Sequence, residues 1–143
     1  MERHDMTTAP RTMDETVQPI RSVRDWLRAE AAAAFVAGVV LYGWLGAPWL
    51  ALLPLLLVPD LSMVGYLHSP RLGAITYNIV HNWVLGLGVL GLGLASGSVP
   101  VSVAGAILIA HVGMDRTLGY GLKLSSFQDT HLGRIGREGK HQS

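Results

Sequence analysis

A few ionisable side chains stand inside or at the ends of long apolar runs, where a charge is costly and usually serves a function. His111 and Asp115 close one run, at the i, i+4 spacing that places both on one helix face. Asp60 interrupts another, directly after Pro59, which has no backbone N–H and loosens a helix at this point. Histidine and aspartate together favour Zn²⁺, Mn²⁺ or Fe²⁺, so these residues indicate a divalent metal site.

A third apolar run adds Asn78, His81 and Asn82, whose i, i+3 and i+4 spacing predicts one shared helix face. After the last run, His131 follows Asp129 in a polar segment that two glycines can turn back over the other candidates. The predicted metal ligands are Asp60, His81, His111, Asp115 and His131, oriented by Asn78 and Tyr120.

Several kinds of chemistry fit this set. A metal could activate water against a lipid or headgroup ester, with Asp60 and Asp115 as the catalytic carboxylates. Haem is a competing cofactor, with His81 and His111 as axial ligands, and a proton or ion relay is another use. In the non-enzymatic alternative, these groups bond to one another and fix helix register in a binding or assembly protein. No HExxH signature decides among them, so the sequence leaves enzyme status open.

The charge distribution determines the class of protein. Residues 1–30 hold 11 of the 21 Asp, Glu, Lys and Arg residues, whereas residues 31–110 hold only Asp60 and Arg71. A soluble domain spreads charge over all its exposed faces, so the apolar centre predicts a membrane domain. The formal net charge of +1 gives no reason to expect a nucleic-acid partner. The absence of cysteine excludes disulfides and thiolate metal sites.

The organisation follows from this pattern. We expect a disordered tail over 1–18, an interfacial amphipathic helix over 19–30, a membrane domain over 31–123 and a cytoplasmic segment over 124–143. Apolar runs at about 31–45, 49–67, 72–95 and 99–118 are separated by short turns. The predicted fold is all-α, a polytopic up-and-down bundle of four transmembrane helices.

Small residues indicate how these helices pack. Ala34 with Gly38, and Ala106 with Ala110, are small-xxx-small pairs that allow close approach between helices or between copies in a homo-oligomer. Ser69 before Pro70 predicts a capped helix start.

Orientation follows from the positive-inside rule. The turns at 46–48 and 96–98 carry no charge, and the arginines and lysines flanking the spans all fall on the opposite side. That side, with both termini, is therefore predicted to be cytoplasmic. The candidate ligands also lie toward this side.

Four stretches carry a family resemblance: PDLSMVGY at 59–66, YNIVH at 77–81, HVGMDRTLGYGLK at 111–123 and FQDTHLG at 127–133. Over residues 30–134 the chain resembles the bacterial integral-membrane family known as domain of unknown function 4260. The resemblance implies a small multi-pass protein of the bacterial inner membrane, with the lipid bilayer as its partner. It assigns no activity, so a lipid or small-molecule substrate is an expectation from the residues alone.

Overall fold

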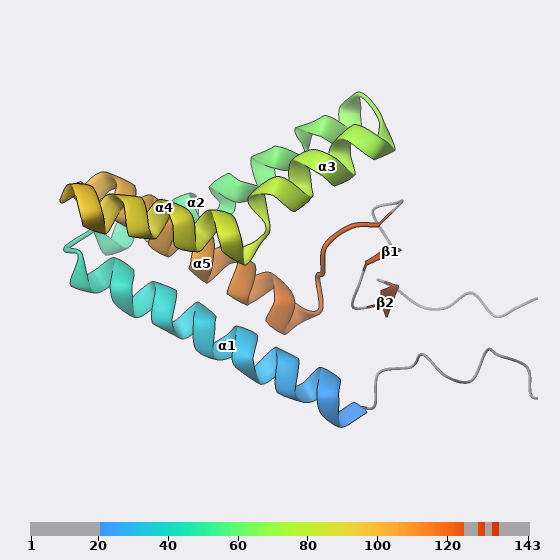
Figure 1. The fold of residues 1–143 in the computed structure, drawn as a ribbon, viewed down its shortest axis with the longest axis horizontal. Coiled ribbons are helices and arrows are strands. Elements are labelled where there is room, and N and C mark those ends of the chain that lie inside the picture. Colours follow the sequence, from blue (N-terminus) through green and yellow to red (C-terminus); the bar gives the residue numbers. More distant parts are fainter. Residues whose placement is uncertain (1–20, 125–128, 131–132, 135–143) are drawn as a thin grey trace, which may run out of the picture.

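Helices form nearly all of the described chain (Figure 1). The computed structural model describes residues 21–124, 129–130 and 133–134 of the 143. The elements are α1 (Arg21–Trp44), α2 (Trp49–Leu57), the 3₁₀ helix η1 (Val58–Leu67), α3 (Pro70–Val80), α4 (Trp83–Ser96) and α5 (Val99–Leu118). Two short antiparallel strands follow, β1 (Asp129–Thr130) and β2 (Gly133–Arg134).

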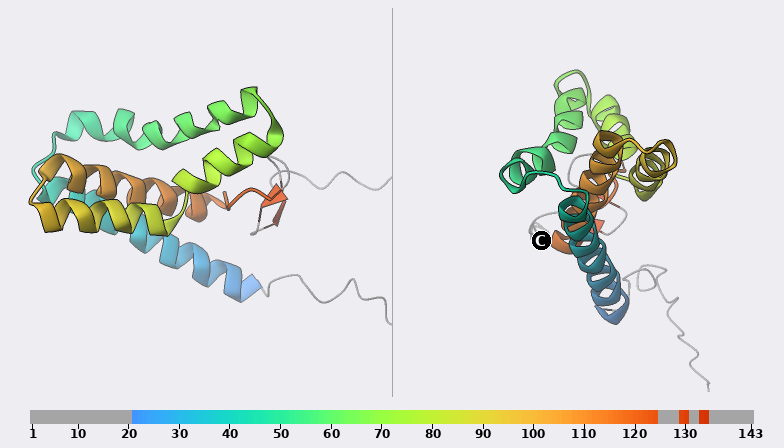
Figure 2. Two further views of the ribbon diagram at one scale, coloured as in Figure 1. Left: turned by 45° about the horizontal axis from the view of Figure 1, so that its top comes forward. Right: turned by 90° about the vertical axis from the view of Figure 1, so that its left-hand side faces the viewer.

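The predicted all-α bundle of four spans is confirmed. Three helical stretches are long and apolar enough to cross a membrane: Val23–Trp44, Trp49–Leu67 and Val99–Leu118. The fourth is the pair α3 and α4, which passes the same test as one span bent by 42°. Short turns connect the spans, which run up and down beside one another (Figures 1 and 2).

The third span differs from the sequence prediction. It is not one helix over 72–95, because α3 ends at Val80 and α4 begins at Trp83. Asn82 caps the new helix, its Oδ1 accepting a hydrogen bond from the backbone N–H of Leu85 at 2.9 Å. The prediction that Asn78, His81 and Asn82 share one helix face was therefore wrong, since asparagine prefers a cap to a helix interior.

The first span also starts earlier than the apolar run. Helix α1 is continuous from Arg21, so the described part of the predicted interfacial segment belongs to the same helix as the span. An interfacial position for its first turns stays a prediction. The predicted tail over 1–18 lies outside the described residues.

Helix α5 is the centre of the bundle, packed between α1 and α4. A Cβ added to Gly38 of α1 would lie only 2.7 Å from the backbone nitrogen of Ala110 and 2.9 Å from the carbonyl oxygen of Ala106. On the α4 side, a Cβ on Gly93 would clash with the backbone nitrogen of Ser102. The small residues thus bring backbones together, as predicted for Gly38, Ala106 and Ala110.

Helices η1 and α3 form a hairpin of their own. Thr76 of α3 donates a hydrogen bond from Oγ1 to the carbonyl of Ser62 in η1 at 2.7 Å. Ser69 caps α3 by accepting from the N–H of Leu72 at 3.2 Å, which confirms the predicted helix start. The hairpin packs mainly on itself, and its closed end diverges from α5 (Figure 1).

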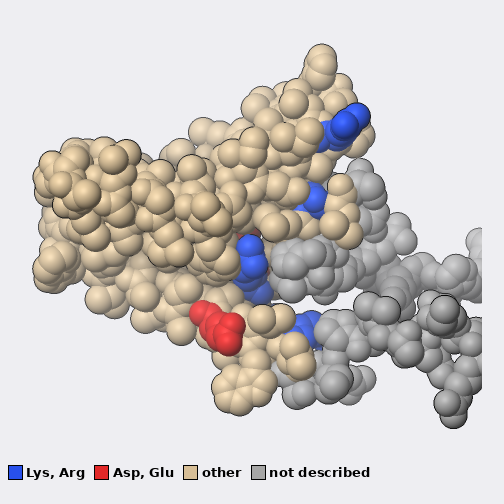
Figure 3. Space-filling model, viewed as in Figure 1, with Lys and Arg blue, Asp and Glu red and all other residues tan. Residues whose placement is uncertain are grey.

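Charge gathers at one end of the bundle. In Figure 3 the basic side chains lie toward the end where α1 begins, α5 finishes and the η1–α3 turn sits. The opposite end, with the α1–α2 and α4–α5 turns, shows no charged side chain in this view. This distribution matches the asymmetry on which the predicted orientation rests.

The close contact at Gly38 gives a test of the packing. We expect Gly38→Ala to destabilise the protein by about 1–3 kcal/mol, because the added methyl group meets helix backbone that cannot move aside cheaply. The measurement is thermal unfolding of the purified protein in one detergent. Gly88→Ala is the control, since nothing lies within 4 Å of a Cβ there. Equal stability of the two variants would contradict this packing.

Candidate metal centre

Four of the five predicted ligands meet at one place inside the bundle. The Nε2 atoms of His81 and His111 are 2.9 Å apart. Oδ1 of Asp60 lies 3.5 Å from each of these nitrogens, and Oδ2 of Asp115 lies 3.8 Å from each. These side chains come from η1, the end of α3 and α5. Their role as ligands stays a prediction.

Backbone carbonyls determine which imidazole nitrogens carry protons. Nδ1 of His111 lies 2.6 Å from the carbonyl oxygen of Leu56, and Nδ1 of His81 lies 2.9 Å from that of Tyr77. A carbonyl only accepts, so each Nδ1 must carry a hydrogen and donate it. In the neutral rings, both Nε2 atoms therefore present lone pairs, and they present them toward each other. A metal-binding histidine typically has this arrangement, with its other nitrogen donating to a carbonyl.

The ligand atoms of Asp60, His81 and His111 approach the size of a metal site. Ligands about 2.0–2.1 Å from Zn²⁺ in a tetrahedron lie roughly 3.3 Å from one another. The carboxylate-to-imidazole distances of 3.5 and 3.8 Å are close to this value. The 2.9 Å separation of the two nitrogens is shorter than this value, and it must open by roughly 0.4 Å. Asp60, His81 and His111 have ligand atoms that all lie within 4.8 Å of one another, and Asp115 is not part of this group of three.

The carbonyl of Leu56 is accessible because the second span changes there from the α-helix α2 to the 3₁₀ helix η1. A 3₁₀ helix pairs each carbonyl with the N–H three residues later, and for Leu56 that residue is Pro59, which has none. The Leu56 carbonyl instead accepts a hydrogen bond from the imidazole of His111. The predicted loosening at Pro59 is thus real, and it orients a histidine on another helix.

The backbone is also irregular at His81, where the third span bends. The carbonyl of Tyr77 accepts from both the backbone N–H of His81, at 2.8 Å, and its ring nitrogen. Irregular backbone at membrane depth is tolerated where it is buried in protein or lines a cavity. The change of helix type in the second span and the break in the third span therefore lie at the same cluster.

Tyr77 is a site residue that was not among the predicted ligands and orienting residues. Its ring stacks on His81, with centroids 3.7 Å apart and planes inclined by 12°. Its hydroxyl donates to Oδ2 of Asp115 at 2.8 Å. Tyr77 thus fixes one imidazole and one carboxylate together. The i, i+4 spacing to His81 was the signal available in the sequence.

Burial differs sharply between the two carboxylates. The residues His81 and His111 are 3% and 0% exposed. The Asp115 side chain is 14% exposed, whereas that of Asp60 is 41% exposed. Access to the cluster is therefore easiest beside Asp60.

The two predicted orienting residues lie outside this inner set of contacts. Asn78 donates from Nδ2 to the carbonyl of Lys123 at 2.7 Å and accepts from its N–H at 2.7 Å. This two-point clamp holds the chain after α5 against α3. Burial lowers the pKa of the Lys123 ammonium group, and the charge of Asp115 partly offsets this shift. Tyr120 lies with its ring centroid 5.7 Å from the same ammonium group.

The remaining predictions concern His131 and haem. His131 lies outside the described residues. Two axial haem ligands bind the iron from opposite sides, with the porphyrin between them. The nitrogens of His81 and His111 are instead in direct contact at 2.9 Å, with a carboxylate on either side. This arrangement favours a single ion over haem.

Comparison with known proteins identifies the family. Residues 24–135 match the family described as Domain of unknown function (DUF4260), and the chain belongs to this family. The predicted resemblance is thereby confirmed, and the description assigns no activity. Neither a curated protein nor a solved structure matches the chain.

The Asn78 clamp can be tested with a single introduced cysteine, because the chain has none. In a Lys123→Cys background, we expect Asn78→Ala to raise the rate of maleimide labelling about tenfold or more, since two hydrogen bonds that hold the segment are lost. Leu124→Cys, at an exposed position, is the control and should label quickly with either residue at 78. An unchanged rate at position 123 would show that Asn78 does not hold the segment.

Proposed function

We propose that this protein is a metal-dependent hydrolase of the bacterial cytoplasmic membrane, with a divalent ion held by Asp60, His81, His111 and Asp115. The substrate is an ester associated with the membrane. The observation that carries the proposal is the contact between two imidazole nitrogens whose tautomers are set by the carbonyls of Leu56 and Tyr77.

Two lone pairs at this distance repel each other unless a cation lies between or beside them. The two carboxylates supply the negative charge that balances a divalent ion in surroundings of low polarity. A metal ion thus satisfies all four groups at once, which favours a metal centre over a purely structural network.

The differing exposure of the carboxylates suggests a division of roles. Asp115 is held by Tyr77 and is less exposed than Asp60, so it acts as a fixed ligand. Asp60 is more exposed and stands in a 3₁₀ helix, so it can turn between binding the ion and accepting a proton. Asp60 is therefore the general base in this proposal.

A bound divalent ion lowers the pKa of water and polarises a carbonyl. In ester hydrolysis, the water oxygen forms a bond to the carbonyl carbon and the ester C–O bond breaks. One water proton passes to Asp60 and then to the departing alkoxide, which leaves as an alcohol. The other proton stays with the acid product. No further reactant is needed.

The alternative is a non-enzymatic polar network that holds the helices in register. One observation favours it: 2.9 Å is also a hydrogen-bond length, so a proton on one Nε2 would join the two rings. Stoichiometric metal in the purified protein separates the two proposals.

The orientation of the chain in the membrane is also part of this proposal. Basic residues at the end that carries the cluster support a cytoplasmic position for that end and for both termini. A substrate from the cytoplasmic leaflet would then have its polar part nearest the site.

The metal content of the purified protein tests the proposed site. We expect about one divalent ion per chain in the wild type by elemental analysis, and a substoichiometric amount in His81→Ala and His111→Ala. Tyr77→Phe should lower metal affinity about 10–100-fold, because Asp115 loses the hydroxyl that orients it.

His68→Ala is the matched control, since His68 is an exposed histidine in the η1–α3 turn. It should retain the full amount of metal. A metal-free wild type that is destabilised by His111→Ala would contradict the metal centre and support the structural network.

The orientation can be tested with single cysteines in intact cells. Ala47→Cys and Ser98→Cys lie in the uncharged turns and should react with a membrane-impermeant maleimide added outside. His68→Cys, at the opposite end, should react only after the cells are opened. The reverse pattern would invert the orientation.

A further inference from the structure

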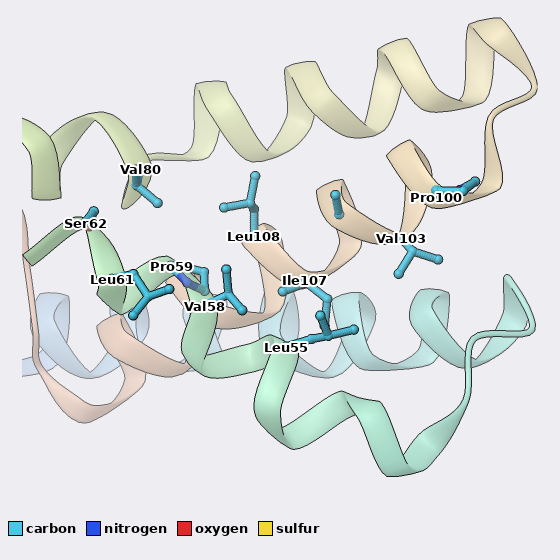
Figure 4. Close-up of a pocket in the computed structure, with 11 residues that line it drawn as sticks. Leu55, Val58, Pro59, Leu61, Ser62, Val80, Pro100, Val103, Ile107 and Leu108 are labelled. Atoms are coloured by element: carbon cyan, nitrogen blue, oxygen red, sulfur yellow. The ribbon is translucent and has the colours of Figure 1, made fainter.

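The bundle also has an apolar groove of about 750 Å³, and Figure 4 shows the side chains that line it. This volume lies within the range of about 300–1,000 Å³ that is common for ligand pockets. The groove is formed where α2 and η1 lie against α5, with one residue of α3 at its inner end. Its lining is Leu55, Val58, Pro59, Leu61, Ser62, Val80, Pro100, Val103, Ala104, Ile107 and Leu108.

One end of the groove lies at the ligand positions. Pro59 and Leu61 are the neighbours of Asp60, and Val80 directly precedes His81. On α5, Ile107 and Leu108 stand one helical turn before His111. The groove thus contacts all three ligand-bearing elements close to their ligands, although the ligand side chains are not part of its lining.

From there the groove runs along α5 toward the uncharged end of the bundle. The α5 lining from Leu108 back to Pro100 covers about 12 Å of helix length. A groove along a spanning helix lies parallel to the hydrocarbon chains of the bilayer. With the cluster on the cytoplasmic side, a lipid of the cytoplasmic leaflet would lie in it with its polar end at the metal.

The groove contains a single polar side chain. Oγ of Ser62 is buried and has no hydrogen-bond partner within the described part of the chain. It lies two residues from Asp60, in the lining near the metal centre. A buried hydroxyl of this kind can donate to a carbonyl oxygen of a bound ester. Exposed Val58 and Leu61 at the edge indicate a groove that opens sideways to lipid.

From these observations we propose that the groove binds one fatty-acyl chain of a membrane phospholipid and presents its ester group to the metal centre. The acyl ester is then the substrate class, an inference that rests on the proposed hydrolase function. The apolar lining recognises the chain, Ser62 recognises the ester carbonyl, and the ion and Asp60 act on the same group.

The test uses purified protein in nanodiscs that contain a small fraction of phosphatidylglycerol with a diazirine in the middle of one acyl chain. After irradiation, mass spectrometry locates the labelled peptides. We expect labelling concentrated on 55–62 and 100–108. Ala104→Phe fills the groove and should remove this labelling, whereas Ala37→Phe, at an exposed position on α1, should leave it unchanged.

Two further variants separate the groove from the metal centre. His111→Ala should lose metal and keep the labelling, whereas Ala104→Phe should keep metal and lose both labelling and ester hydrolysis. Equal labelling of all lipid-facing helices, unchanged by Ala104→Phe, would overturn acyl-chain binding whatever the metal content. Groove labelling in a metal-free wild type would overturn the hydrolase and the substrate role, and leave a lipid-binding groove.

Discussion

Two imidazole nitrogens directed at one point, inside an apolar bundle, are the constraint around which this structure is organised. Each ring is held by a backbone carbonyl, so neither His81 nor His111 can turn its lone pair away without losing that hydrogen bond. Two carboxylates lie against the same point. Positive charge is the one addition that satisfies all four groups.

The irregular parts of the fold follow from this constraint. A regular second span would use the Leu56 carbonyl within its own helix, and a straight third span would carry His81 in the middle of a helix. The second span changes to a 3₁₀ helix around Pro59, and the third span is interrupted before the cap at Asn82; both irregularities lie at the cluster. Discontinuous membrane helices commonly place their breaks at binding sites. The separate packing of the η1–α3 hairpin also leaves the groove beside α5.

The sequence was sufficient for the architecture and for the place of the site. Apolar runs, short turns and charge asymmetry predict four spans, and topology then brings Asp60, His81, His111 and Asp115 to one end. The contacts that orient the two imidazoles could not be predicted from the sequence, because they involve backbone carbonyls, which every residue has. The break at His81 was missed because the i, i+4 spacing of Asn78 and Asn82 suits a continuous helix equally well. The sequence assigned no specific contact to Tyr77, since stacking depends on side-chain direction.

The central claim is that the cluster coordinates a divalent ion, and X-ray absorption at the edge of the metal that copurifies with the protein tests it most directly. The account predicts a four-coordinate site with two imidazole nitrogens and carboxylate oxygens at about 2.0–2.2 Å. The imidazole scattering should be lost in His81→Ala and kept in His68→Ala. A spectrum with oxygen ligands alone, or one that is unchanged in His81→Ala, would contradict the account.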